Sequence, residues 1–138
     1  MSEACQKVTT QQISQLESAI QQAEKAVKQQ PHQLTNFQLL HLDYEFHRLI
    51  AKSSSNKRLI FLLDQVFDQM TLLRIRTLQH NPRVLEICSE HERIYQAIAQ
   101  RQTELAVQAM RHHLTYSKAR VVQEIQQLEL ILDSTDTT

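Results

Sequence analysis

Apolar residues recur every three or four positions along most of the chain, the spacing that places them on one face of an α-helix. Residues that interrupt helices separate five such stretches, among them Pro31, the run 53–56 and Asn81-Pro82. The pattern therefore predicts five long helices, over roughly residues 10–30, 34–53, 57–79, 83–99 and 103–132.

Capping chemistry predicts where several of these helices begin and end. The hydroxyl of Thr9 or Thr10 can cap the first helix. Asn56 is expected to take the left-handed conformation after the second helix, because the chain has no glycine for that position. Residues 2–8 suit a helix but are too few to form a stable one alone, and they resemble the end of a longer helix. On the third helix an apolar stripe is expected to face the core: Leu59, Leu62, Leu63, Val66, Met70 and Leu73.

Long helices with short connections predict an all-α fold, an antiparallel bundle of about five to six helices. Composition supports this, because 138 residues suit one domain with one core and the chain has no glycine and two prolines. Fifteen basic residues balance fifteen acidic ones, which is unlike the footprint of a nucleic-acid-binding domain. Two cysteines, no membrane-length apolar run and no signal peptide predict a cytoplasmic protein without a disulfide scaffold.

Four potential metal ligands interrupt the apolar stripes. Asp43 and His47 are four residues apart and share a helix face, while His91 and His113 lie in the stripes of two other helices. A buried carboxylate is costly unless it is paired or bound to a metal. Three imidazoles and a carboxylate suit a divalent ion, with zinc expected first and nickel or manganese as alternatives. The residues alone leave a second interpretation open, in which these are hydrogen-bonded core side chains.

Other polar residues are weaker candidates. Arg74 continues the inward series of the third helix, where it can bind an effector carboxylate or, as we prefer, pair with Asp43, a glutamate or solvent. Arg83 and Tyr116 are effector-binding candidates of the same kind. His112 is about 100° around the helix from His113 and is expected at the surface.

Three segments together resemble the C-terminal FCD domain of FadR-type regulators in the GntR family. They are LDYEFHRLIA at 42–51 followed by Asn56, SEHERIYQAI at 89–98 and AVQAMRHHL at 106–114. The resemblance covers about residues 1–125. Each segment is weak alone, but their order and spacing agree with the family pattern.

The resemblance implies a helical effector domain over residues 1–132, with a polar tail at 133–138. It implies that Asp43, His47, His91 and His113 bind the metal, that a small organic acid is the effector and that the domain forms a homodimer. Arg101-Gln102 stands where the family usually has Gly-Asp, so the cap of the last helix is expected at Gln102 or Thr103. The family's winged helix-turn-helix has no counterpart in this sequence, so we expect DNA binding only through such an N-terminal domain and none to membranes.

Two other functions compete with a sensing domain. A metal-dependent hydrolytic enzyme would need a general base near the ion, and the sequence has no H-E-x-x-H motif. A structural bundle would need no metal at all. We therefore expect a regulatory domain and not an enzyme.

Overall fold

The computed structural model describes residues 1–28, 33–81 and 87–135, and within these ranges the chain forms six helices and no strand. This confirms the predicted all-α fold. No helix within these ranges combines the length and apolar character needed to cross a membrane. The predicted stop at Pro31 and start at Arg83 lie outside the described residues. The helices are α1 (Ser2–Lys7), α2 (Thr10–Lys28), α3 (Gln33–Ser53), α4 (Lys57–His80), α5 (Ile87–Ala99) and α6 (Thr103–Thr135).

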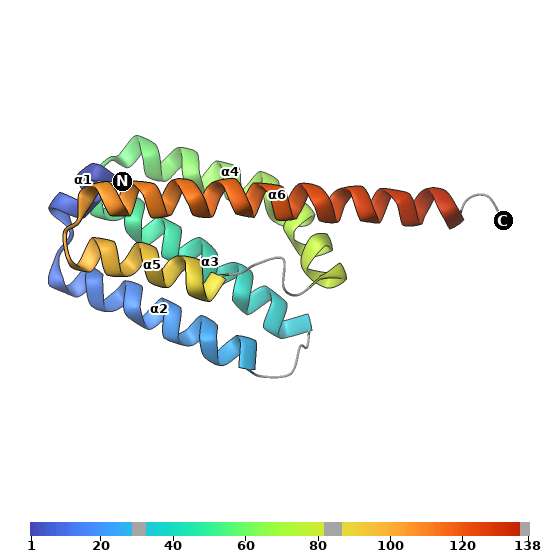
Figure 1. The fold of residues 1–138 in the computed structure, drawn as a ribbon, viewed down its shortest axis with the longest axis horizontal. Helices are drawn as coiled ribbons and strands as arrows, with labels where there is room; N and C mark the ends of the chain where they lie inside the picture. The colour runs from blue at the N-terminus through green and yellow to red at the C-terminus, as the bar shows by residue number, and fades with distance from the viewer. Residues whose placement is uncertain (29–32, 82–86, 136–138) are drawn as a thin grey trace.

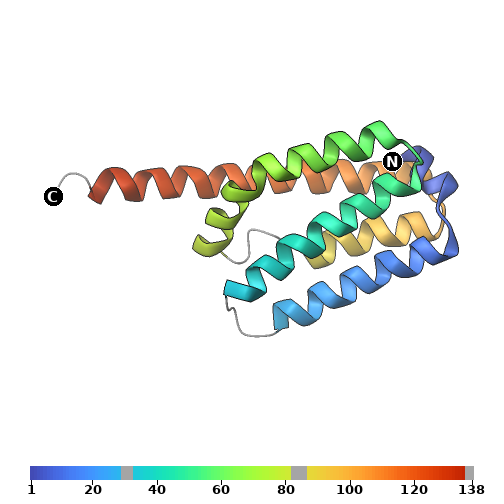
Figure 2. The ribbon, with the colours of Figure 1, turned by 180° about the vertical axis from the view of Figure 1, so that it is seen from behind.

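The five long helices form a ring around one core, in which neighbours run antiparallel except α4 and α6, which run in the same direction (Figure 1). Helix α2 packs against α3 and α5, α3 packs against α4, α5 packs against α6, and contacts between α4 and α6 close the ring. The short α1 covers one end of the bundle, where it contacts α3, α5 and α6. Helix α6 projects beyond the other helices toward the C-terminus (Figure 2) and ends three residues later than predicted.

The largest buried cluster draws its side chains from every helix of the ring except α4, whose Leu78 is buried outside that cluster. Leu16 and Ile20 of α2 meet Phe46 of α3 and Ile94 of α5 in one cluster. The inward stripe predicted for α4 is wrong, because α4 packs on α3 with a narrow face and leaves the apolar side open. Four of its expected core residues are exposed: Leu59 (40%), Leu62 (48%), Val66 (48%) and Met70 (38%).

Side-chain caps define the helix starts at two corners. The Thr9 hydroxyl accepts from the Gln12 amide at 3.2 Å and the Gln12 side chain accepts from the Thr9 amide at 3.0 Å, as the predicted cap requires. The prediction for Asn56 is wrong: Ser55 takes the left-handed conformation, with φ of 58°. Asn56 instead begins α4, because its side chain accepts from the Leu59 amide at 3.0 Å.

The corner between α5 and α6 joins the two helices that carry His91 and His113. Arg101 has φ of 55°. The Gln102 amide donates to the Ala97 carbonyl at 2.8 Å and the Arg101 amide to Ile98 at 2.9 Å, which is a Schellman motif. Helix α6 begins at Thr103, so Gln102 is its N-cap, as predicted.

Candidate metal centre

Asp43, His47, His91 and His113 converge from α3, α5 and α6. Asp43 and His47 lie on adjacent turns of α3, where a spacing of four residues aligns their side chains. Each of the four residues offers one donor atom, and these atoms all lie within 4.8 Å of one another. The residues predicted as ligands therefore meet at one point of the fold.

The distances between these donor atoms suit one ion. His113 Nε2 lies 3.1 Å from His47 Nε2. Asp43 Oδ1 lies 3.7 Å from His47 Nε2 and 3.5 Å from His91 Nε2. Donor atoms that share an ion at about 2.0–2.2 Å are themselves roughly 3 to 4 Å apart. Three of the distances between donor atoms fall in this range, so the four side chains could approach one divalent ion.

His91 has the least explained environment of the four. Its side chain is 1% exposed, and its ring stacks on Phe46 with centroids 3.9 Å apart. Among the described residues, its Nε2 has no hydrogen-bond partner. A buried polar atom without a partner costs about 1–3 kcal/mol. This nitrogen faces Asp43 Oδ1 and the other imidazoles, so a bound cation would supply the missing partner.

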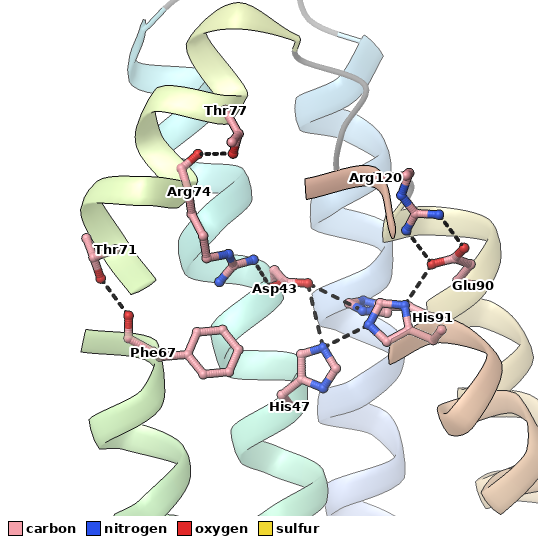
Figure 3. Close-up of polar contacts among 10 residues, drawn as sticks. Asp43, His47, Phe67, Thr71, Arg74, Thr77, Glu90, His91 and Arg120 are labelled. Atoms are coloured by element: carbon pink, nitrogen blue, oxygen red, sulfur yellow. Dashed lines mark hydrogen bonds and ion pairs between the residues drawn. The ribbon is translucent and has the colours of Figure 1, made fainter. Parts of the chain in front are cut away.

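A carboxylate orients the His113 ring. His113 Nδ1 lies 2.7 Å from Glu90 Oε2, and Arg120 donates to both Glu90 oxygens at 2.8 Å (Figure 3). An ionised carboxylate only accepts hydrogen bonds, so Nδ1 carries the proton and Nε2 is left with its lone pair toward the cluster. Burial alone would raise the pKa of Glu90, but the hydrogen bonds from Arg120 and His113 lower it.

Arg74 of α4 is the cationic neighbour of the cluster. Its Nη2 donates to Asp43 Oδ2, and its guanidinium lies 4.9 Å from the centre of the Phe67 ring (Figure 3). Asp43 is one of the three kinds of partner, with a glutamate or solvent, that the sequence favoured for Arg74. It leaves Asp43 Oδ1 directed at His47 and His91.

Burial favours the neutral imidazole at His47 and His91, and neighbouring side chains keep Asp43 ionised. Burial lowers the pKa of His47 to about 4 and that of His91 well below its usual value. Burial would raise the pKa of Asp43, but the neighbouring side chains of His47, Arg74 and His91 lower it. At neutral pH, Asp43, His47 and His91 therefore have the protonation states that a metal requires.

A cavity of about 200 Å³ opens beside the cluster, between α3, α4 and α6. Asp43, His47 and His113 line it together with Arg74. The rest of its wall is mostly apolar and includes Leu63, Met70 and Leu114. A small molecule in this cavity can therefore reach both the donor cluster and the guanidinium.

Tyr116, a further effector-binding candidate, does not line this cavity. Tyr116 is 53% exposed, and its ring stacks on His112 with centroids 4.1 Å apart. His112 is exposed, as predicted. Arg83 lies outside the described residues.

Sequence reasoning missed Glu90 and Arg120. Arg120 follows His113 by seven residues, two helical turns, so both lie on one face of α6. Glu90 is adjacent to His91 in the chain yet binds His113. The seven-residue spacing could have suggested Arg120, but the role of Glu90 depends on how α5 packs beside α6.

Comparison with known proteins gives one family match. A profile of the FCD domain matches residues 1–116. The chain is 35% identical to the Glc operon transcriptional activator of Escherichia coli over 77 residues, which are 53% of this chain and 30% of that protein. It is 28% identical over 107 residues to YdhC of Bacillus subtilis, an uncharacterized HTH-type transcriptional regulator, covering 77% of this chain and 46% of that protein.

No solved structure gives a significant match. The chain spans less than half the length of the curated relatives it matches. Those relatives carry the names of transcription regulators, in agreement with the sequence-based expectation of a regulatory domain and not an enzyme.

Proposed function

Because the chain belongs to the FCD domain family of GntR-type regulators, we propose that it is an effector-sensing domain of the FadR type that binds a divalent metal ion and a small organic acid. Asp43, His47, His91 and His113 would hold the ion, with zinc expected before nickel or manganese. The ion would link α3, α5 and α6 and offer a remaining coordination position to an oxygen of the effector.

One observation carries this proposal: four donor atoms from three helices lie within 4.8 Å, and the buried His91 Nε2 among them has no partner in the described part of the chain. A purely structural histidine cluster would be expected to satisfy such an atom. Glu90 adds support, since a carboxylate behind a metal-bound histidine fixes its tautomer and orientation.

Charge balance favours an anionic effector. The buried charges around the cluster already form two neutral pairs, Asp43 with Arg74 and Glu90 with Arg120. A divalent ion among neutral imidazoles would therefore leave positive charge uncompensated in a poorly hydrated site. A small carboxylate in the cavity of about 200 Å³ would reduce that charge and could also accept a hydrogen bond from Arg74.

Metal reconstitution with two matched histidine variants tests the proposal. After metal removal and reloading with zinc, elemental analysis should give one ion per chain. His91→Ala should abolish tight binding, while His112→Ala, which alters an exposed histidine of α6, should leave it unchanged. Absence of stoichiometric metal, or equal behaviour of the two variants, would refute the ligand assignment.

We also expect a homodimer, the assembly that lets a regulator contact two operator half-sites. The apolar side of α4 supports self-association, because Phe61 (60% exposed) and Leu72 (75% exposed) have no cover within one chain's described residues. Light scattering at tens of micromolar should give twice the mass of one chain, and a monomer mass would contradict this. DNA recognition would belong to a helix-turn-helix domain of the kind named in the Bacillus relative.

A further inference from the structure

A second cavity lies between α3 and α4, on the other side of Arg74 from the cluster. Its volume is about 290 Å³, and Phe37, Tyr44 and Phe67 line it with Leu40 and Ile75. Three of the chain's seven aromatic residues therefore surround one cavity. Such a wall suits a flat apolar group.

The aromatic wall is held in place by polar contacts on its outer side. Tyr44 donates to Asp64 at 2.8 Å, and Arg48 donates to the same carboxylate at 3.0 Å. The Tyr44 and Phe67 rings lie 5.2 Å apart at 59°. These contacts fix two rings at one end of the cavity, so the site is formed before any molecule enters.

Arg74 provides a cation at this aromatic end. It lines both this cavity and the one beside the metal cluster. The guanidinium has five N–H donors, and the hydrogen bond to Asp43 uses Nη2. Its side chain is 11% exposed, so an anion reaching it from the cavity would be largely shielded from water. Asp68 and His41 also line the cavity, and the Asp68 carboxylate would act on any anion there.

Asn36 provides an acceptor at the other end. A separate small pocket of about 10 Å³ shares Phe37, Leu40 and Ile75 with the cavity, and Asn36 lines it too. Its Oδ1 is buried and has no hydrogen-bond partner among the described residues. Asn36 and Asp43, the partner of Arg74, are two turns apart on α3, a separation of roughly 10 Å. A molecule with an acidic group at one end and a donor at the other can span that distance.

We propose that the α3–α4 cavity is a second small-molecule site that binds a hydroxylated aromatic carboxylate. The carboxylate pairs with Arg74, the ring lies among Phe37, Tyr44 and Phe67, and the hydroxyl donates to Asn36 Oδ1. Binding here does not require the metal. If the proposed metal site holds, a carboxylate on Arg74 offsets a positive charge beside the ion, so each would tighten the binding of the other by the same factor.

Calorimetric titration of the full chain with 4-hydroxyphenylacetate, in the presence of a chelator, tests the site apart from the metal. We expect saturable binding at one site. Thr71→Trp should weaken it at least tenfold, because Thr71 is an exposed residue that lines the cavity and the larger ring would fill it. Gln69→Trp, an exposed change on the same helix away from the lining, should leave binding unchanged.

Phenylacetate, which lacks the hydroxyl, tests the role of Asn36. To the unchanged protein, phenylacetate should bind several-fold more weakly than the hydroxylated acid. To the Asn36→Ala variant, the two acids should bind equally well. Three outcomes would overturn the second site. They are the absence of binding, equal effects of the two tryptophan variants, and binding that is seen only with zinc and is lost in His91→Ala. The last outcome would place the acid at the metal instead. Failure of zinc to bind would refute the proposed function, but the titration with chelator would still test the second site.

Discussion

Glu90 shows how one side chain sets the chemistry of another in this site. It accepts a hydrogen bond from His113 Nδ1 at 2.7 Å and itself accepts two hydrogen bonds of 2.8 Å from Arg120. The His113 ring is therefore fixed before an ion arrives, and the second nitrogen is directed at the cluster. A metal site assembled from such a ring needs less reorganisation on binding.

Glu90→Gln should weaken zinc binding about 10–100-fold, because the neutral amide is a weaker acceptor for His113 Nδ1 and has no charge to pair with Arg120. Competition titration against a chromophoric chelator measures the change. Glu92→Gln is the matched control, since Glu92 lies on the same helix and bonds only to Gln96 among the described contacts at 2.9 Å. Equal affinities of the two variants would show that Glu90 does not support the site.

The four proposed ligands could be predicted from sequence because each breaks an apolar stripe. Asp43 and His47 needed only helical spacing, since four residues bring side chains to one face. Glu90 could not be predicted in the same way, because it lies beside His91 in sequence but serves His113 in space. Its role depends on the packing of α5 on α6, which local spacing does not determine.

At the scale of elements, Arg101 joins three helices at one corner. It takes a left-handed conformation between α5 and α6, with φ of 55°. Its guanidinium donates to the carbonyls of Gln6 at 3.0 Å and Val8 at 2.9 Å, and to that of Cys5 at 3.3 Å. These are the carbonyls at the end of α1, which a helix leaves unpaired. These hydrogen bonds attach α1 to the corner between α5 and α6, the helices that carry His91 and His113.

Arg101→Ala should lower the free energy of unfolding by about 2 kcal/mol, because it removes these bonds and keeps a Cβ in the left-handed region. Arg101→Gly loses the same bonds but relieves the backbone, so it should be about 1 kcal/mol less destabilising. Urea unfolding measures both values. In both variants the amides of α1 should exchange faster with deuterium. A glycine variant as unstable as the alanine variant would rule out backbone strain at this corner.

Helix boundaries were predictable where a breaker or cap is local, as at Thr9 and Gln102. The error at Asn56 arose because two roles compete for one asparagine, and its side chain caps α4 while Ser55 takes the left-handed position. The error on α4 has another cause. An apolar stripe predicts that a face will be covered, but not that the same chain covers it.

At the scale of the whole molecule, the ring of helices encloses ionisable groups that the unfolded chain would expose. Burial lowers the pKa of His47 from 6.5 to about 4 and lowers that of His91 well below its usual value. Between these values and pH 6.5, the unfolded chain binds more protons than the folded one. The stability of the fold therefore depends on pH in the range where histidine titrates.

Metal-free protein should lose stability as pH falls from about 6.5 to about 4, because protons stabilise the unfolded chain over that window. His47 alone contributes a loss on the order of 3 kcal/mol, from a pKa lowered to about 4. Below pH 4 both states of His47 are protonated, and its contribution stops changing. Urea unfolding at pH 7, 5.5 and 4.5 measures the slope, which should be reduced in His47→Gln and unchanged in the exposed-site variant His112→Gln. Equal unfolding free energies at pH 7 and 4.5 would mean that the fold does not hold these histidines neutral. The site would then lack the neutral donors that a metal ion needs.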